Sequence, residues 1–317
     1  MSIHNKPLEI EEQVLLMKKY VVFSRKVRMK KFLMYAGYFR ASRYGKYLLS
    51  NTTILGKKPE QDLLFAIYDF DMKLREVLMK YCKKAEIQFK SHLSNSISIK
   101  TDTATFYLND DYYTPSKSER DKKKKESNIK FFEKFKRKIV NNEGKLRSDI
   151  LKYPELKEYR KGGKKSKYKI PSWVAFSYFE FGTITLIYSY LKGDLRKEVL
   201  KYGYSKNRYG KEVTKQVDTW LDAIRNLRNV CAHHNVLVGR TSSIVLFNNE
   251  DYDLTLSLSN TNLFSRLYAL KKVLNNDDAR LLKEDLEKII KRSKIDIYEL
   301  NILPVNWEDI YDGIKLL

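Results

Sequence analysis

The sequence comprises 317 residues, which is enough for one large globular domain or two small ones with a buried core. Apolar residues make up 43% and charged residues 32%, which excludes a disordered chain, and no apolar run approaches the ~18–20 residues of a membrane-spanning helix. Lys and Arg number 62 against 39 Asp and Glu, a net charge of +23. Such an excess costs self-repulsion unless a polyanion offsets it, so nucleic acid is the expected partner, ahead of an anionic membrane surface.

The N-terminal segment and the cysteines indicate the compartment. The first residues, MSIHNKPLEIEEQ, are polar and acidic, unlike a secretory signal. Cys82 and Cys231 are the only cysteines, which is too few for a disulfide framework or a zinc site built from cysteines. We therefore expect a cytoplasmic protein that uses no metal or cofactor and does not enter a membrane.

The first predicted elements are helical and rich in aromatic residues. Residues 8–35 have apolar side chains at helical spacing, and Pro7 precedes the first turn. Residues 32–49, FLMYAGYFRASRYGKYLL, alternate tyrosines with cations, and such rings can stack on bases while the cations hold phosphates. The candidate RNA-binding residues here are Tyr38, Arg40, Arg43 and Tyr44. An equally supported alternative is that the aromatic residues only pack helices together.

A long helix is predicted over residues 61–95, where apolar residues form a stripe at helical spacing. Asp69 and Asp71 lie two residues apart, on different sides of such a helix, which argues against a metal-binding pair. We expect both on the helix surface, or an ion pair with Arg75.

Residues 101–170 are expected to form a basic, flexible insertion. Lysine runs and the Gly162–Gly163 pair are typical of exposed segments. KGGKKSK lacks the GxxxxGK(S/T) spacing and the preceding strand of a phosphate-binding loop. A mobile basic flap over RNA and a solvated loop are both compatible with this composition. The candidate RNA-binding lysines are Lys122, Lys123, Lys124, Lys164, Lys165 and Lys167.

The C-terminal part is predicted to be mainly helical. Helices are expected over residues 171–200, buried because they are apolar almost all round, and over 212–238 and 262–292. Between the last two, alternating segments around NNED predict a β-hairpin near 242–258. The expected fold is therefore all-α, a helical bundle with a small β-hairpin and a basic flexible insertion. We expect a single domain over 1–317, with helical parts at 1–100 and 171–317 and the insertion at 101–170.

The segment TWLDAIRNLRNVCAHHNVLVG, residues 219–239, contains two of the four histidines. On an ideal helix, at about 100° per residue, His234 lies on the apolar face and His233 on the polar side. Asn229 is one turn before His233, and Arg225, a possible supporting residue, is one turn before Asn229. Arg228 lies about 140° around the helix from His233. Any of three features would bring an arginine close to His233: the length of the Arg228 side chain, a kink in the helix, or a second copy of the motif.

This geometry predicts different roles for the two histidines. His234 is expected to be partly buried and structural, whereas His233 is an exposed imidazole that can give or take a proton near neutrality. An imidazole can deprotonate a ribose 2′-OH or protonate the leaving 5′-oxygen, and the Arg228 guanidinium can stabilise a phosphorane. The nucleophile then belongs to the substrate, so no metal is required. The expected products are a 2′,3′-cyclic phosphate and a 5′-hydroxyl, and DNA would be spared.

The spacing of these residues is typical of a known superfamily. RNVCAHH, with four residues between Arg228 and His233, resembles the Rx4–6H signature of the HEPN superfamily. The flanking LDAIRNLRNVCAHHNVL is similar to the Abi_2 family of abortive-infection proteins (AbiD/AbiF type). Further matching segments follow the family's order: KPLEIEEQVLLMKKY, YAGYFRASRYGKYL, YDFDMKLREVL, IPSWVAFSYFEFGTITLIYSYL and LPVNW. Two features depart from the family, the NVLVGR sequence after the histidines and the long Lys-rich insertion at 115–169.

The resemblance implies a HEPN-like helical fold, metal-independent ribonuclease activity and phage defence by growth arrest. Arg228, His233 and Asn229 carry over as the catalytic residues, with His234 as the adjacent motif histidine. It also implies a toxin controlled by a small noncoding RNA. HEPN sites usually combine two motifs, and the nearest second candidate here, Lys84 to His92, lacks the arginine. Either two chains pair as a homodimer, which we favour, or another surface of the same chain completes the site. The basic surface is alternatively occupied by an RNA in a one-to-one complex. The alternatives are a non-catalytic RNA-binding sensor and a module that blocks a phage or host protein.

Overall fold

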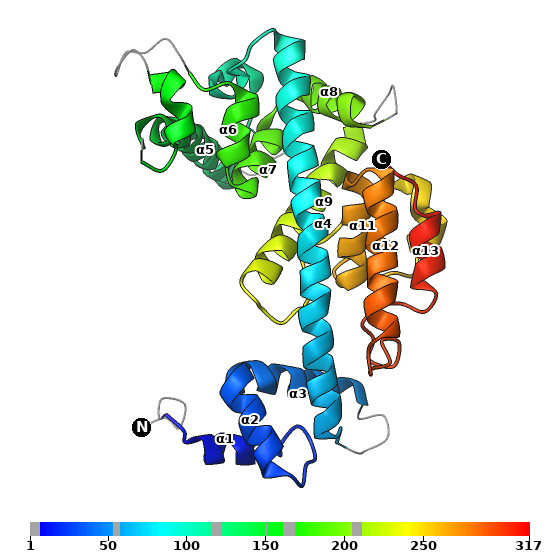
Figure 1. Ribbon diagram of the computed structural model, residues 1–317. Helices are drawn as coiled ribbons and strands as arrows, with labels where there is room; N and C mark the ends of the chain where they lie inside the picture. Colours follow the sequence, from blue (N-terminus) through cyan, green and yellow to red (C-terminus); the bar gives the residue numbers. More distant parts are fainter. Residues whose placement is uncertain (1–6, 53–57, 116–121, 150, 161–168, 205–210) are drawn as a thin grey trace. The chain divides into compact units, whose positions relative to one another are not determined.

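The computed structural model describes residues 7–52, 58–115, 122–149, 151–160, 169–204 and 211–317, and they are mainly helical (Figure 1). These ranges contain no β-strand, only isolated bridges that pair Val22 with Glu60 and Tyr113 with Leu191. The predicted all-α fold is therefore confirmed. Within the same ranges, no helix has both the length and the apolar character required to cross a bilayer.

The chain divides into two compact units, and the division falls within two long helices, α4 (Gln61–Thr101) and α9 (Lys211–Ala232). Unit 1 comprises Met1–Cys82 and Asn226–Leu316, and unit 2 comprises Lys83–Arg225 with Leu317. The parts expected at 1–100, 101–170 and 171–317, and a single domain over 1–317, stay predictions.

The N-terminal half of unit 1 contains α1 (Ile10–Met17), α2 (Lys26–Ala36), α3 (Tyr38–Thr52) and the beginning of α4 (Gln61–Thr101). The helical stretch predicted over 8–35 is interrupted between α1 and α2. There the backbone of Val22 instead bonds to Pro59 and Gln61, at 2.8 and 3.1 Å. The long helix predicted over 61–95 is confirmed as α4. Its Phe65 and Tyr68 pack on Phe32 of α2, with ring centroids 4.7 and 5.1 Å apart.

The C-terminal half of unit 1 contains η7 (Asn249–Asp251), α10 (Tyr252–Thr255), α11 (Leu263–Val273), α12 (Asn276–Lys291) and α13 (Trp307–Gly313). In Figure 1, α11, α12 and α13 lie side by side, and the Tyr311 hydroxyl of α13 donates to the Ala279 carbonyl of α12 at 2.9 Å. The helix predicted over 262–292 is broken in two because the Asn275 side chain caps α12, accepting from the Asp278 N–H at 2.8 Å. Every residue of α11 is buried.

The predicted β-hairpin near 242–258 does not form. Asn248 begins the turn η7, and α10 follows where the second strand was expected. The Asn248 N–H donates to the Tyr268 hydroxyl of α11 at 2.7 Å, so a group that a strand ladder would use bonds to a helix. Tyr268 in turn donates to the buried Asp251 carboxylate at 2.7 Å. Tertiary contacts with α11 thus override the alternating local pattern.

Unit 2 contains the rest of α4, η3 (Phe106–Leu108), η4 (Asp110–Tyr112), α5 (Lys122–Ser148), η5 (Pro154–Arg160), α6 (Ser172–Tyr178), α7 (Phe181–Tyr190), α8 (Gly193–Gly203) and most of α9 (Lys211–Ala232). The helix predicted over 171–200 is three helices, with extended backbone at Phe179 and Leu191. Its central part, α7, is buried as predicted. Aromatic pairs fill the core, including Phe106 with Phe176 and Phe89 with Tyr188, at centroid distances of 5.8 and 5.3 Å.

Much of the described part of the Lys-rich insertion is a helix, α5. Phe132, Phe135 and Ile139 recur at helical spacing and are buried. The Phe135 ring packs on Tyr113 and on Tyr190 of α7. The expectation of a flexible segment is therefore wrong for α5, because its apolar face packs on unit 2.

Candidate functional site

Helix α9 carries the histidine motif at its C-terminal end. The apolar side chains along one face of this helix are buried, namely Trp220, Ala223, Ile224, Leu227 and Cys231. Asp222 and Asn226 on the opposite side are partly exposed, and Asn229 is exposed. The amphipathic pattern of this helix was therefore predicted correctly as far as Cys231.

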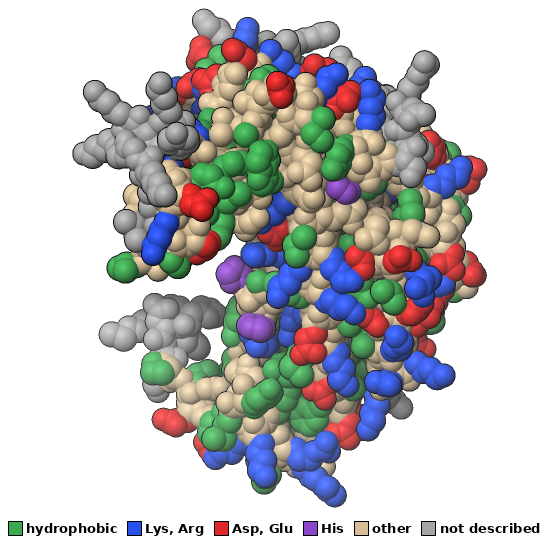
Figure 2. Space-filling model, turned by 45° about the horizontal axis from the view of Figure 1, so that its top comes forward, with side chains coloured by type: hydrophobic (Ala, Val, Ile, Leu, Met, Phe, Trp, Pro, Cys, Tyr) green, Lys and Arg blue, Asp and Glu red, His purple; other side chains and the backbone are tan. Residues whose placement is uncertain are grey.

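The helix ends earlier than predicted, at Ala232, and this places both histidines beyond it. The N–H of His234 bonds to the Cys231 carbonyl at 3.2 Å, and that of Asn235 bonds to the Val230 carbonyl at 3.0 Å. These two bonds, with a left-handed φ of 52° at His234, form a Schellman motif. The predicted burial of His234 on the apolar face is wrong, because the chain has left the helix, and His233 and His234 are both exposed. Figure 2 shows two neighbouring histidine side chains at the surface beside Lys and Arg side chains.

A buried carboxylate holds the loop that follows α9. Asp71 of α4 accepts hydrogen bonds from the backbone N–H groups of Leu237 at 3.1 Å and Val238 at 2.8 Å. The predicted ion pair of Asp71 with Arg75 is present, but Asp71 is fully buried, so its expected surface position is wrong. Arg75 also donates to the Asn235 carbonyl at 3.4 Å. The pair thus fixes both ends of the segment 235–238.

The hydroxyl of Tyr44 joins α3 to the same network. It donates to Asp71 at 2.5 Å and accepts from Arg75 at 3.1 Å. Burial raises the pKa of the Asp71 carboxyl, and Arg75, Tyr44 and the two backbone N–H groups oppose that rise. Burial and the neighbouring Asp71 raise the pKa of Tyr44, so its hydroxyl remains a donor. This network connects α3 and α4 with the histidine loop.

A glycine allows α3 to approach the loop closely. Gly239 has a φ of +68°, and a Cβ atom built there would lie 2.3 Å from the Tyr47 ring. Only glycine fits both the left-handed backbone and this contact. The Tyr47 hydroxyl donates onward to the Leu300 carbonyl, which links α3 with the segment before α13.

A polar cavity of about 280 Å³ opens within unit 1 beside the end of α9. The described residues that line it come from α9, the loop after it and α11. They are Asn226, Asn229, Val230, His233, Asn235, Arg240, Thr241, Ser242, Ser243 and Arg266. Imidazole, guanidinium, amide and hydroxyl groups predominate, and this set of described lining residues includes no carboxylate. A wall of cations and hydrogen-bond donors suits a phosphate group.

Two of the three predicted catalytic residues, Asn229 and His233, line this cavity, and the third contacts the Asn229 side chain. Asn229 and His233 share a backbone hydrogen bond of 3.0 Å, from the His233 N–H to the Asn229 carbonyl. Arg228 is adjacent, with its guanidinium 3.4 Å from the Asn229 side-chain oxygen. Arg225, the possible supporting residue, forms an ion pair with Asp222 in unit 2 and does not line the cavity.

The predicted RNA-binding residues of α3 are placed differently from one another. Tyr44 is completely buried in the Asp71 network, so its ring is not available to stack on a base. The alternative of helix packing therefore applies to Tyr44. Tyr38, Arg40 and Arg43 are partly exposed, and the Arg43 guanidinium lies over the exposed Phe39 ring at 6.0 Å. Their contact with RNA stays a prediction.

The lysine candidates fall largely outside what the structure describes. Lys122, Lys123 and Lys124 begin α5, but their side chains are not among those described. Lys164, Lys165 and Lys167 lie outside the described residues. His92, the histidine of the second candidate motif, packs in unit 2 between Tyr202 and Tyr204, and burial lowers its pKa.

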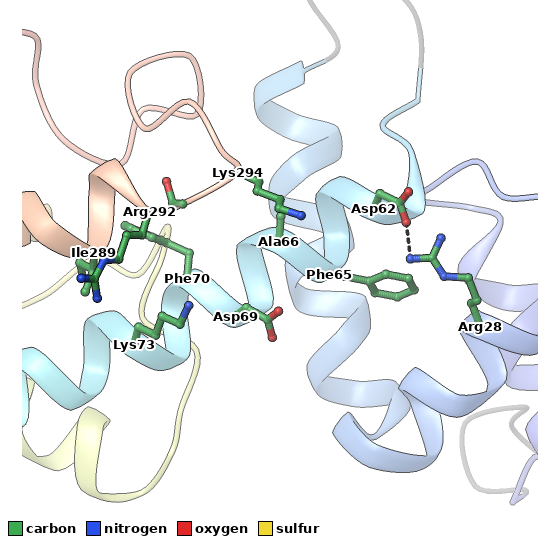
Figure 3. A pocket seen from close by; sticks show the side chains of 11 residues that line it. Arg28, Asp62, Phe65, Ala66, Asp69, Phe70, Lys73, Ile289, Arg292 and Lys294 are labelled. Carbon is green, nitrogen blue, oxygen red and sulfur yellow. Dashed lines mark ion pairs between the residues drawn. The ribbon is translucent and has the colours of Figure 1, made fainter.

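A second pocket, of about 420 Å³, lies in unit 1 between α2, α4 and the end of α12 (Figure 3). Arg28 forms an ion pair of 2.8 Å with Asp62 beside the Phe65 ring. Asp69 projects from the same helix as Lys73, so carboxylates offset the cations of this pocket. Its mixed charge suits a phosphate less well than the cavity beside His233.

Neither the burial of Asp71 and Arg75 nor the position of Arg240 and Arg266 in the cavity was predicted from the sequence. Asp71 and Arg75 continue the apolar register of Ile67, Leu74 and Leu78, and that spacing was a signal for burial. Arg266 sits in a helix whose other positions are buried, and it could have been singled out as a lone cation in the apolar run LFSRLYAL. No comparable feature of the sequence around Arg240 indicated that this residue lines the cavity.

The described residues include no group of three or more His, Cys, Asp or Glu side chains placed to hold a metal ion. Cys231, next to the motif, is buried, and this burial raises the pKa of its thiol to about 12. The thiol is therefore protonated at neutral pH and is not a nucleophile.

Fold and site define an all-α protein with a cation-lined cavity at the end of a histidine-bearing helix. The sequence model of the Abi-like protein family (Abi_2) matches residues 31–238, and the chain belongs to this family. Membership indicates a role in abortive infection, a form of phage defence. No curated protein and no solved structure matches the chain significantly. The family match includes Tyr44, Asp71 and the histidine motif, whereas Arg240 and Arg266 lie beyond its end.

Proposed function

We propose that this protein is a HEPN-type endoribonuclease toxin of a phage-defence system, and that it cleaves RNA without a metal. The observation that carries the proposal is the cavity beside α9, in which His233 and Asn229 face cations and hydrogen-bond donors. Membership of the Abi-like family and the net charge of +23 support it independently.

Each motif residue has a chemical role in this proposal. His233 transfers a proton to or from the reacting oxygens, because an imidazole exchanges protons near neutral pH. Arg228 stabilises the negative charge that develops on the phosphorane, and Asn229 positions the phosphate or Arg228 by hydrogen bonding. Attack of the ribose 2′-oxygen on phosphorus breaks the bond to the 5′-oxygen. The products are a 2′,3′-cyclic phosphate and a 5′-hydroxyl.

Transesterification uses both a base and an acid, and His233 is the one imidazole among the described residues of the cavity wall. His234 is exposed next to it and is a candidate for the second group. We also propose that two copies of the chain pair, so that each contributes its motif to a shared site. A small noncoding RNA bound to the basic surface is the proposed means of control.

The experiment compares wild type with His233→Ala and Arg228→Ala, each purified free of nucleic acid. Arg280→Ala is the matched control, since it removes an exposed arginine from α12. Total RNA is incubated with each protein in EDTA, and the ends of the products are mapped. We expect cyclic phosphate ends with wild type and the control, and at least a 100-fold loss in the two motif variants, within the range for a proton-transfer or oxyanion-stabilising group. A mixture of the two motif variants should regain activity if two chains share the site.

Other outcomes favour other functions. Equal cleavage by all variants would mean that the motif is structural. Tight RNA binding without cleavage by any protein would favour a non-catalytic RNA-binding sensor, which the net charge alone also supports.

A further inference from the structure

The cavity beside His233 contains a second cation that the motif does not include. Arg266 of α11 lines the cavity and is only 2% exposed. Its Nη2 atom donates to the backbone carbonyl of Arg240 at 2.7 Å. For Nε and Nη1 of the same guanidinium, no hydrogen-bond acceptor is found among the residues that the structure describes. A buried charged group with unused donors is costly unless a ligand completes it.

The other buried cations of α11 show what a structural role looks like. Lys272 forms a 2.6 Å ion pair with Asp251, and both side chains are fully buried. Lys271 donates to the carbonyl oxygens of Tyr311 and Asp312, and its ammonium lies 4.6 Å from the Tyr311 ring centroid. Within the described ranges, Arg266 forms no comparable ion pair. Its charge is therefore not accounted for by the fold.

The electrostatic surroundings of Arg266 favour an anion. Burial, together with the charge of Arg240, lowers the pKa of Arg266 to about 10, so the guanidinium is still charged at neutral pH. The C-terminal end of α9, which forms part of the cavity wall, carries a partial negative charge. A phosphate bound beside His233 needs cations to offset that charge, and Arg240 and Arg266 are positioned in the cavity to do so.

We propose that Arg266, assisted by Arg240, binds the phosphodiester that is presented to His233. The inference rests on the proposed ribonuclease function and adds the phosphate-binding residue to it. The unused N–H donors on Nε and Nη1 lie on different sides of the planar guanidinium, and either one can form a charge-assisted hydrogen bond with a phosphate oxygen. Arg266 binds the phosphodiester before the reaction in this assignment, whereas Arg228 stabilises the phosphorane as proposed above.

The test uses Arg266→Met, which keeps the side-chain volume approximately, and the control Arg280→Met. The melting temperature of each full-length protein is measured in inorganic phosphate and in chloride at equal ionic strength. Binding of a 2′-O-methyl RNA oligonucleotide is measured by fluorescence anisotropy. This probe lacks the attacking hydroxyl, so its binding does not depend on whether the protein cleaves RNA.

We expect phosphate to raise the melting temperature of wild type and Arg280→Met but not of Arg266→Met. The oligonucleotide should bind Arg266→Met about tenfold or more weakly, as for loss of a charge-assisted hydrogen bond. In chloride, Arg266→Met should melt at the same temperature as wild type or higher, because an unpaired buried charge has been removed. A structural role would instead lower that temperature and leave the phosphate response unchanged, which would overturn the proposal.

The remaining outcomes separate this proposal from the ribonuclease proposal. His233-dependent cleavage with normal phosphate and RNA binding by Arg266→Met overturns the role of Arg266 alone. Arg266-dependent binding by a protein that cuts no RNA overturns the ribonuclease and keeps the phosphate site. A phosphate response with unchanged oligonucleotide affinity would identify free phosphate as the ligand and overturn the assignment to RNA. If Arg266→Met does not fold, Arg240→Met is measured in its place, and an unchanged phosphate response overturns the proposal.

Discussion

His234 occupies a backbone position that usually belongs to glycine. With a φ of 52° it is the left-handed residue that ends α9, and a Cβ atom in this conformation costs about 1–2 kcal/mol. Strain of this kind is common where a side chain is used, and here it keeps an exposed imidazole next to His233. Asp102, Asn301 and Asn306 also have a positive φ, so the conformation of His234 bears on stability, and its functional role rests on the resemblance of the motif.

The strain predicts opposite effects of one substitution at two adjacent residues. His234→Gly should raise the free energy of unfolding by about 0.5–1 kcal/mol, because glycine adopts the left-handed conformation freely. His233→Gly, at the preceding position where φ is not positive, should lower it by a similar amount. Urea denaturation followed by circular dichroism measures both. A loss of stability in His234→Gly would show that contacts of the imidazole outweigh the strain, and loss of RNA cleavage in a stabilised His234→Gly would assign His234 to the reaction.

At the scale of elements, the histidine loop depends on helices that are distant in sequence. Asp71 and Arg75 of α4 hold the backbone of residues 235–238, and Tyr44 of α3 completes the network. A buried ion pair of this type gains little stability compared with apolar packing, but removal of one partner leaves an uncompensated charge. We infer that the network acts in positioning the loop, and through it His233.

Asp71→Asn should therefore be strongly destabilising, whereas Asp69→Asn should not. Asn at position 71 leaves the Arg75 charge buried without its counterion, and we expect a loss of about 3–5 kcal/mol in the free energy of unfolding. Asp69 is exposed on the same helix, and its substitution should change stability by less than about 0.5 kcal/mol. Urea unfolding of the two variants checks this. A small effect of Asp71→Asn would mean that the loop is held mainly by apolar contacts.

At the scale of the whole molecule, the dominant property of the sequence is its net charge of +23. Lys and Arg side chains are spread over the face shown in Figure 2 and are not confined to one block. Spread charge of this kind favours binding along a nucleic-acid backbone, with little dependence on base sequence. For the proposed ribonuclease, we therefore expect cleavage specificity to depend on access to the cavity and not on overall affinity.

The charge predicts a strong dependence of RNA binding on salt. Each phosphate contact to single-stranded RNA contributes about −0.7 to the slope of log K against log salt concentration. With three or more contacts, a rise from about 50 to 200 mM salt should weaken binding of the 2′-O-methyl oligonucleotide by more than tenfold. Fluorescence anisotropy over that range gives the slope. Binding that is weak and independent of salt would instead favour a module that recognises a protein.

The sequence by itself determined the features that depend on local spacing. Apolar residues at helical intervals predicted α4, the buried α7 and the inner face of α9, because the period of a helix is set within a few turns of chain. His233 is exposed as predicted, although it lies beyond the end of the helix on which that prediction was based. The motif between Arg228 and His233 indicated the family that the match over residues 31–238 then showed.

Only the tertiary structure decided the features that depend on groups far apart in the chain. Helix α9 ends at Ala232, which leaves His234 exposed. A few residues later, the N–H groups of Leu237 and Val238 donate to Asp71 of α4 instead of continuing the helix. The hairpin near 242–258 was lost to contacts with α11. The cavity is lined by residues of α9, of the loop after it and of α11, and its first and last lining residues, Asn226 and Arg266, are 40 positions apart in the sequence. No local period encodes these placements, because they arise when buried polar groups far apart in sequence satisfy one another.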